Sequence, residues 1–386
     1  MSPITIVFLT VFIDLLGFGI IIPLLPFYAE TFGANALTVG LLNTSFSFMQ
    51  FLFAPFWGRL SDRIGRRPVI LAGLLGSAVS YLLFGLATSL TLLFAARIAA
   101  GIAGANIPTA QAYMADVTTP ENRAKGMGLV GAAFGLGFIF GPAIGGFLSQ
   151  WGYQAPSFFA SGLSFVNLIA AWFLLPESRP VRDAGPVART SRLAAMRNAL
   201  ARPGLPGILM IYFIVITAFS SFEMNFSLYA GFRFGFDSTS IGYVFAFIGA
   251  TLALVQGVLV GRVVRLAGER QVIRAAIVAI AAGLALIPLA GGVPLLVGAC
   301  GLLAAGMGFN SPSITSLISR LSRADEQGGI LGLSQSVASL ARIIGPAWGG
   351  FLYDAFGRTS PFFSASAMLC VAWVMSLVML GAPNED

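Results

Sequence analysis

The sequence predicts an all-α membrane protein with twelve transmembrane helices in two pseudo-symmetric six-helix bundles. The first observation behind this prediction is composition. Of 386 residues, 57% are hydrophobic and only 10% are charged, and the mean hydropathy is +0.88. A water-soluble protein of this size has too little interior to hide so much apolar surface. The apolar runs are also long and do not alternate with polar residues, which excludes a transmembrane β-barrel.

An internal repeat is the second observation. Residues 128–148 are matched by residues 332–352 at a constant spacing, so that the Gly-Pro pair at Pro142 recurs at Pro346. At the same spacing, Asn106-Ile-Pro108 is matched by Asn310-Ser-Pro312. A duplicated apolar unit is typical of membrane transporters built from two halves.

Twelve apolar runs are long enough to cross a bilayer, which takes about 20 residues as a helix. They cover residues 4–30, 37–58, 68–87, 91–114, 124–148, 156–176, 205–231, 239–264, 271–289, 293–318, 328–353 and 360–381. We therefore expect an N-terminal six-helix bundle over residues 1–176, a cytoplasmic linker over 177–204 and a C-terminal six-helix bundle over 205–386.

The basic residues predict the orientation of these spans. Most of the 22 Lys and Arg residues follow an even-numbered span, in five loops that would share one side of the membrane. By the positive-inside rule this side is cytoplasmic, which predicts a multi-pass protein of the cell inner (plasma) membrane with both termini in the cytoplasm. The net charge of +7 is then a topology signal, so we expect the lipid bilayer and no nucleic acid as a partner.

Several kinds of chemistry lack their residues. The sequence has no histidine, and its two cysteines, Cys300 and Cys370, lie in apolar runs without metal-ligand spacing. No nucleophile–base pair or phosphate-binding loop is visible, since the glycine-rich stretches lie within spans and do not follow strands. We expect a monomer that is not an enzyme and holds no cofactor or metal.

Four charged residues lie well inside predicted spans, away from the span ends. Asp14 lies near the middle of the first span, where a carboxylate is costly unless it is paired, hydrated or protonated. It is our candidate for proton coupling, with Arg97 of span four as the cation that biases its ionisation. The alternatives are a fixed ion pair between the two, or a static structural charge at Arg97. Glu223 of span seven is a second candidate proton site, or an interfacial and solvated acid, and Arg342 of span eleven needs a partner.

Four segments carry a family resemblance. Gly58-Arg-Leu-Ser-Asp62-Arg-Ile-Gly65-Arg66-Arg67 resembles the loop signature of the major facilitator superfamily. In span four, the segment that begins at Arg97 resembles the fourth-helix motif of the same superfamily. Span one reads FIDLLGFGIIIPLLP and is similar to the first helix of tetracycline-efflux and related multidrug exporters. Span five contains the motif associated with drug:proton antiporters, with Gly137, Gly141, Pro142, Gly145 and Gly146. The chain is identified as a member of this superfamily, in its twelve-span drug:proton antiporter branch.

The resemblance implies a cytoplasmic gate after span two. Its residues would be Gly58, Asp62, Gly65, Arg66, Arg67 and Asp116. In the resembled fold Asp62 meets the start of span eleven, and Arg66 or Arg67 can meet Asp116 at the end of span four. The alternative is that the arginines only enforce topology. The second half inverts these charges, because Glu269 aligns with Arg66 and Arg320 aligns with Asp116, and this inversion predicts that the halves meet through complementary pairs.

The antiporter motif predicts a packing surface. Gly137, Gly141 and Gly145 recur every fourth residue and form one smooth helix face for close approach, while Pro142 can bend the helix. The resemblance implies span eight as the partner of this face, although such faces also occur generally in membrane bundles. Polar candidates for a substrate cavity, which are otherwise hydrogen bonds between helices, are Gln50, Asn106, Gln111, Asn225, Asn310, Gln335 and Arg342.

Together these features predict a proton-coupled exporter of hydrophobic or amphiphilic small molecules or drugs that works by alternating access between two halves. The alternatives are a specific metabolite, sugar or lipid carrier of the same fold, and a non-transporting membrane receptor. Tetracycline itself is not the expected cargo, since the tetracycline-efflux proteins that the chain resembles carry an acid in span nine and residues 275–289 contain none.

Overall fold

The structure is a computed structural model that describes all residues except 1–2, 106, 119–122, 179–203, 322–326 and 380–386. The described residues form helices joined by short turns, and they contain no strand. The predicted class, an all-α membrane protein, is confirmed.

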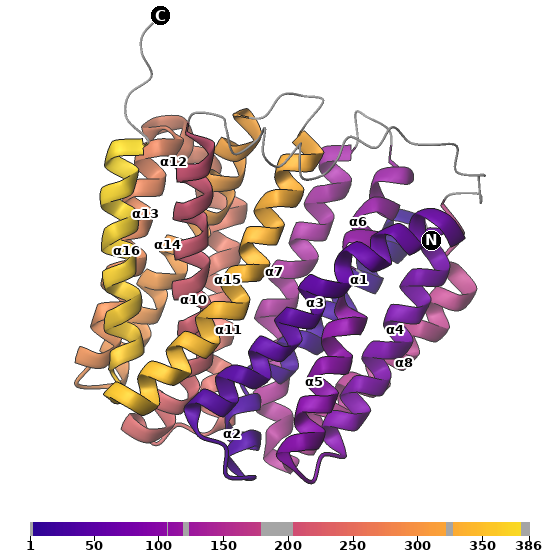
Figure 1. Ribbon diagram of the computed structural model, residues 1–386, viewed down its shortest axis with the longest axis horizontal. Coiled ribbons are helices and arrows are strands. Elements are labelled where there is room, and N and C mark those ends of the chain that lie inside the picture. The colour runs from indigo at the N-terminus through magenta and orange to yellow at the C-terminus, as the bar shows by residue number, and fades with distance from the viewer. Residues whose placement is uncertain (1–2, 106, 119–122, 179–203, 322–326, 380–386) are drawn as a thin grey trace, which may run out of the picture. The chain divides into compact units, whose positions relative to one another are not determined.

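The described residues of the first half of the chain form eight α-helices and one 3₁₀ turn (Figure 1). In chain order they are α1 (Pro3–Ile21), α2 (Leu25–Glu30), α3 (Ala36–Ile64), α4 (Arg66–Gly85), α5 (Leu90–Gly104), α6 (Ile107–Asp116), α7 (Arg123–Leu148), η1 (Ser149–Trp151) and α8 (Gln154–Leu174).

The second half contains seven α-helices and a π-helical turn (Figure 1). These are α10 (Leu205–Phe234), α11 (Ser238–Leu254), the π turn η2 (Val255–Leu259), α12 (Val260–Ala267), α13 (Glu269–Leu289), α14 (Val293–Arg320), α15 (Gln327–Phe356) and α16 (Ser360–Met379).

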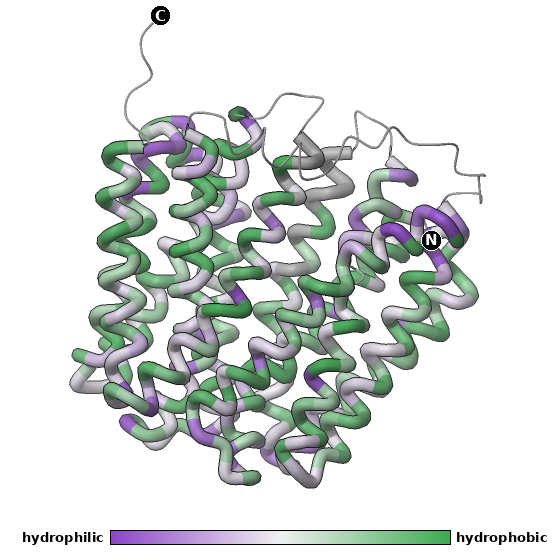
Figure 2. Tube along the Cα trace, viewed as in Figure 1, coloured by the Kyte–Doolittle hydropathy of each residue, from purple (hydrophilic) through white to green (hydrophobic). Residues whose placement is uncertain are grey.

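Ten of these helical stretches are long and apolar enough to cross a membrane. They correspond to ten of the twelve predicted spans, and α7 and α15, with 26 and 30 residues, cover the predicted fifth and eleventh spans. Hydrophobic residues follow the helices along most of their length (Figure 2). Many large apolar side chains face outward, among them Phe165 and Phe173 of α8 and Val374 and Val378 of α16, as expected of a protein whose solvent is lipid.

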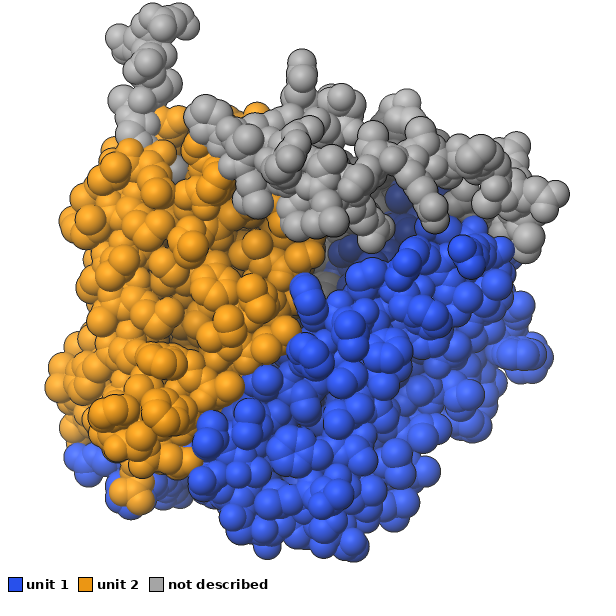
Figure 3. Space-filling view, in the orientation of Figure 1, with its two compact units in different colours: residues 1–185, 230–249 blue, residues 186–229, 250–386 orange. Residues whose placement is uncertain are grey.

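The contacts within the chain divide it into two compact units (Figure 3). Unit 1 contains residues 1–185 and 230–249, and unit 2 contains residues 186–229 and 250–386. The beginning of α11 therefore packs with helices of the first half of the sequence, although it follows the predicted linker. The division at residues 177–204 stays a prediction about the duplicated halves and does not coincide with these units.

Two predicted spans are interrupted at prolines. The first span, expected over 4–30, is divided by a turn at residues 22–24 into α1 and α2, because Pro23 has no backbone N–H to continue the helix. Span four is divided between Gly104 and Ile107. Pro108 leaves the carbonyl of Gly104 without its helical donor, and the Gln50 side-chain amide donates to that oxygen at 3.2 Å.

Close packing between α1 and α7 forms the centre of unit 1. The buried core there draws on five helices and includes Val7 and Leu15 of α1, Leu74 of α4, Tyr113 of α6 and Ala133 of α7. Other helix pairs in this unit are α4 with α8, α4 with α5 and α3 with α5. In unit 2, α13 packs against α14 and α16.

Candidate functional site

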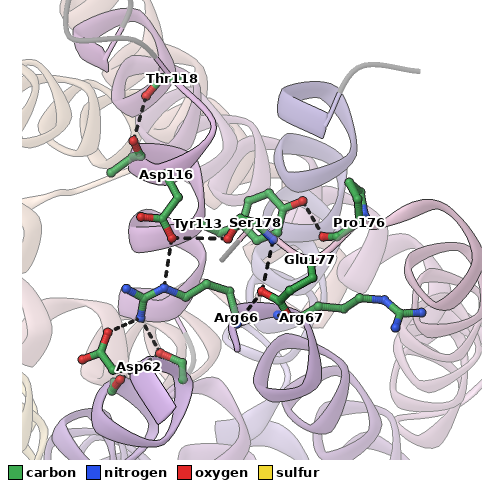
Figure 4. A network of polar contacts seen from close by, with 12 residues as sticks. Asp62, Arg66, Arg67, Tyr113, Asp116, Thr118, Pro176, Glu177 and Ser178 are labelled. Carbon is green, nitrogen blue, oxygen red and sulfur yellow. Dashed lines mark hydrogen bonds and ion pairs between the residues drawn. The ribbon is translucent and has the colours of Figure 1, made fainter. Parts of the chain in front are cut away.

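The turn between α3 and α4 is built around a buried arginine. Gly65 ends α3 with a φ of +101°, a conformation that glycine adopts without steric cost. It delivers Arg66 into a cluster of oxygens (Figure 4): Nη1 lies 2.6 Å from Ser61 Oγ and 2.9 Å from Asp62 Oδ1, and Nε lies 3.2 Å from Asp116 Oδ2. We call these four residues, Ser61, Asp62, Arg66 and Asp116, the Arg66 network.

Glu177, just after α8, binds the start of α4 beside this network. Its carboxylate accepts the backbone N–H groups of Arg66 at 2.8 Å and Arg67 at 3.1 Å, so an anion satisfies the free donors at a helix N-terminus. A Cβ at Gly65 would meet this carboxylate. Arg67 donates to the Trp172 carbonyl at 2.5 Å and lies over the Trp172 ring. Sequence reasoning missed Glu177, although it is an acid directly at the end of a span and beside a basic segment.

Asp116, at the end of α6, contacts both the turn between α3 and α4 and the segment that follows α8. The Ser178 hydroxyl donates to its Oδ2 at 3.3 Å, and the Tyr113 hydroxyl donates to the Pro176 carbonyl at 2.7 Å (Figure 4). The ends of α3, α4, α6 and α8 are therefore joined by charge-assisted hydrogen bonds, and the predicted Arg66–Asp116 contact is present. Gly58 differs from expectation, because within the described part of the chain no atom lies within 4 Å of a Cβ there. Its predicted close helix approach is not seen.

Unit 2 contains a counterpart of the Arg66 network with reversed charges. Arg320 Nη2, at the end of α14, lies 3.4 Å from Glu269 Oε1, at the start of α13. The Ser316 hydroxyl donates to the same oxygen at 2.5 Å. The Glu269 side chain is 8% exposed and that of Arg320 is 72% exposed. The charge inversion read from the sequence thus forms an ion pair inside one unit, and the predicted pairing between halves stays a prediction.

Asp14 and Arg97 occupy the interior of unit 1 without forming an ion pair in the described structure. Asp14 of α1 accepts a hydrogen bond from the Ser77 hydroxyl of α4 at 2.9 Å. Arg97 of α5 is 3% exposed; it donates to Asn43 Oδ1 at 3.0 Å and its Cζ lies 4.4 Å from the centroid of the Phe46 ring. The alternative of a fixed Asp14–Arg97 pair is therefore not what the structure shows. Ser77 and Asn43 were not predicted, since neither residue type stands out in an apolar helix.

Span eight was the predicted partner of the glycine stripe of α7. In the structure this stripe packs against α1 instead. A Cβ at Gly137 would lie 2.9 Å from the Leu15 side chain, and one at Gly141 would lie 2.7 Å from the backbone of Gly19. One at Gly145 would meet the backbone of Ile20. Glycine is required at these positions because the two backbones touch, as at the close crossings of membrane helices.

Span eight contacts the neighbouring face of the same motif. A Cβ at Gly146 would lie 3.0 Å from Gly242 Cα, and one at Gly242 would meet the carbonyl of Pro142. Further along α11, a Cβ at Gly249 would lie 2.7 Å from the carbonyl of Phe138. Both helices contribute glycines, so α7 is held between α1 and the start of α11, all in unit 1. The sequence signal that was missed is the spacing of Gly242 and Gly249 on α11.

The cavity candidates differ in their local surroundings within each unit. Gln50 is occupied by the carbonyl at the break in span four. Asn225 is fully buried and donates to the Ser221 carbonyl at 2.8 Å. The other positions are described by exposure: Asn310 is buried, Gln111 half-buried, and Gln335 and Arg342 exposed; Asn106 lies outside the described residues.

The second intramembrane acid has a cationic neighbour. Glu223 is half-buried on α10 and lies within electrostatic range of Arg342 of α15. Both residues belong to unit 2. The described residues contain no group of three acidic or thiol side chains that could hold a metal ion.

A chain of long apolar helices with a few charged residues in their interior is a multi-span membrane protein of the transporter class. Comparison with known proteins identifies it further. The model of the Major Facilitator Superfamily matches residues 7–346 and 257–386. The chain belongs to this superfamily, is a membrane transporter and is not an enzyme.

Two curated relatives are named as resistance proteins. Multidrug resistance protein 2 of Bacillus subtilis is 32% identical over 97% of this chain and 94% of its own length. Tetracycline resistance protein, class E, of Escherichia coli is 34% identical over 90% of this chain and 87% of its own. These similarities place the chain in the drug:proton antiporter branch that its motifs indicated.

A solved structure supports the fold across the whole chain. The human organic anion transporter MFSD10 (TETRAN) superposes with a TM-score of 0.74 at 29% identity, covering 97% of this chain and 100% of that one. The nucleoside transporter NupG gives a TM-score of 0.81 at 13% identity, which is evidence for the fold alone.

Proposed function

We propose that this transporter exports hydrophobic or amphiphilic small molecules from the cell in exchange for protons. It would act in the inner membrane, with both termini in the cytoplasm. The observation that carries the proposal is Asp14, a membrane-embedded carboxyl group that is half-buried, hydrogen-bonded by Ser77 and not paired with the neighbouring Arg97. Intramembrane acids of this kind mark proton and substrate pathways.

Protonation of Asp14 would alternate with the direction in which the site opens. Facing the acidic outside, the carboxylate takes up a proton; facing the cytoplasm, it releases the proton and cargo binds. A neutral acid is far cheaper than a carboxylate in lipid surroundings, so the protonated form favours the return of the empty carrier. The printed names of the bacterial relatives, multidrug and tetracycline resistance proteins, support export of drug-like cargo.

The Arg66 network would serve as the cytoplasmic gate. It joins the ends of four helices through bonds that are all made in unit 1. Because a nearly buried arginine is bonded to two acidic side chains, loss of the arginine leaves both carboxylates without their shared cation. We propose that its strength sets how readily the cytoplasmic side opens, with Glu177 as a part of the gate that the sequence did not reveal.

The test is proton-driven uptake of ethidium into inside-out proteoliposomes with an imposed pH gradient. We expect Asp14→Asn to lower gradient-driven ethidium uptake at least tenfold, while exchange of ethidium at equal concentrations on both sides persists. The matched control is Asp354→Asn, which changes an exposed acid of α15 and should leave both rates unchanged. Full gradient-driven uptake by Asp14→Asn contradicts the assignment of Asp14.

A second candidate is a carrier for organic anions. It is favoured by the buried Arg97, whose Nε has no hydrogen-bond partner, and by the 29% identity to a human organic anion transporter. The same liposomes decide between the two, because this candidate predicts uptake of an anionic dye such as fluorescein and none of ethidium.

A further inference from the structure

Tyr81 of α4 lies beside the proposed proton site and has no assigned role so far. The side chain is 7% exposed. Its ring rests on Gly17 of α1, where an added Cβ would lie 2.9 Å from Tyr81 Cε2 and 3.0 Å from the hydroxyl oxygen. Gly17 is three residues after Asp14, so the two lie on the same face of α1. The absence of a side chain at Gly17 therefore brings the phenol next to the acid.

The Tyr81 hydroxyl lies in the field of both charged groups. Asp14 and Arg97 each interact electrostatically with it, although they are not bonded to each other. Asn43 and the Phe46 ring hold two sides of the Arg97 guanidinium, and Nε remains buried without a partner. The guanidinium thus keeps hydrogen-bonding capacity that the described residues do not use.

Asp14 and Arg97 are the charged groups among the described residues whose fields act on the Tyr81 hydroxyl. Residues 128–148 of α7 and all of α8 contain no acid, base or tyrosine. The charged and titratable residues of α3 begin at Arg59, and those of α6 begin at Tyr113. They lie at the helix ends that form the Arg66 network. The groups that face Tyr81 are therefore Asp14 from α1 and Arg97 from α5, with the neutral Ser77 on its own helix.

We propose that Tyr81 is a positioning residue whose hydroxyl links Asp14 to Arg97 during transport. A phenol has one donor and can accept two hydrogen bonds. It donates to the ionised Asp14 carboxylate and accepts from the Arg97 guanidinium, so the cation supports the carboxylate without forming a salt bridge. When Asp14 takes up a proton, the carboxylate no longer attracts the donor, and the hydroxyl is free to turn. Arg97 then experiences the protonation of Asp14 through Tyr81. This inference rests on the proposed proton coupling.

The test is Tyr81→Phe, which removes the hydroxyl and keeps the ring on Gly17. Gradient-driven ethidium uptake is measured between pH 5 and 9, together with ethidium exchange without a gradient. Without its donor the Asp14 carboxylate holds its proton more tightly, so we expect the midpoint of the pH curve to move to higher pH by about one unit, the size expected for a hydrogen bond to a charged group. Exchange without a gradient should stay within about twofold.

The matched control is Tyr28→Phe. Tyr28 is 2% exposed in the same unit, and its hydroxyl donates to the Ala87 carbonyl, beyond the end of α4, at 2.8 Å. Its pH curve should superimpose on that of the wild type. Gly17→Ala is the second variant, because its methyl group must displace the Tyr81 ring and should move the midpoint in the same direction.

Three results overturn the inference, and they are distinguishable. If wild-type uptake follows the proton gradient but the Tyr81→Phe and Gly17→Ala curves superimpose on it, the link is wrong and the proposed function stands. If wild-type uptake is insensitive to the gradient, the proposed function fails and this inference falls with it. A parallel shift in the Tyr28→Phe curve also contradicts it, since loss of any buried hydroxyl would then suffice.

Discussion

Substituting Gly141 tests whether α1 and α7 are held at backbone contact. A methyl group at this position would lie 2.7 Å from the Gly19 backbone and 2.9 Å from the backbone N of Ile20, whereas ordinary van der Waals contact begins at 3.4 Å. Backbone atoms cannot rotate away as side chains do, so Gly141→Ala must separate the helices along their crossing. Overpacking of a filled interior costs about 1–3 kcal/mol, and we expect the upper end of that range.

The control is Gly135→Ala, nearly two turns earlier on the same helix. No described atom lies within 4 Å of a Cβ there, so the only expected effect is the better helix propensity of alanine, about 1 kcal/mol in its favour. The two variants should therefore differ by roughly 3–4 kcal/mol in free energy of unfolding. The assay is equilibrium unfolding of purified protein in mixed micelles with increasing SDS, followed by tryptophan fluorescence. Equal stability of the two variants refutes the backbone contact.

Three further predictions follow from hydrogen bonds. Gln50→Leu should lower the free energy of unfolding by about 1 kcal/mol. Pro108→Ala restores a backbone donor, so Gln50→Leu should cost much less when it is introduced together with Pro108→Ala. Additive effects of the two substitutions in the same assay would contradict this. Arg66→Asp and Asp116→Arg should each lower the free energy of unfolding by about 2–3 kcal/mol. The double variant, in which the charges are exchanged, should recover part of this loss, as the reversed pair of unit 2 suggests. A double variant that is no more stable than either single variant would refute this. Hydrogen bonds from the Ser240 hydroxyl and backbone N–H hold the pKa of Asp237, before α11, below its usual value. This contribution to stability is complete above the unfolded-state pKa of about 4 and is lost as the pH falls through the lower folded-state pKa. The free energy of unfolding of the wild type should therefore exceed that of Asp237→Asn at pH 7, and the difference should shrink as the pH is lowered below about 4; a difference that widens in acid would contradict the assignment.

The number and order of the membrane-spanning segments could be predicted from the sequence, because a segment needs a minimum length of apolar residues to cross a bilayer. What could not be predicted is which prolines interrupt a helix. Pro23 and Pro108 lie at breaks, whereas Pro142, Pro312 and Pro346 lie inside continuous helices. At Pro108 the released carbonyl of Gly104 accepts a hydrogen bond from Gln50 of another helix, a tertiary contact that the local sequence does not reveal.

The charged members of the candidate site could be predicted because charges are rare and costly in lipid. Asp14, Arg97 and the Arg66–Asp116 contact all belong to this group. Their neutral partners could not, since serine, asparagine and tyrosine are frequent in membrane helices and their roles depend on register. Tyr81 becomes visible only once Gly17 is seen to lie beneath its ring.

The position of α11 separates the unit of duplication from the unit of packing. Residues 230–249 belong to the second copy of the repeat but pack with the first half, where Gly242 and Gly249 cover the glycine motif of α7. A gene for the first half alone would encode a chain whose α7 lacks this cover. The two copies of the repeat are therefore coupled by helix packing as well as by the continuous chain.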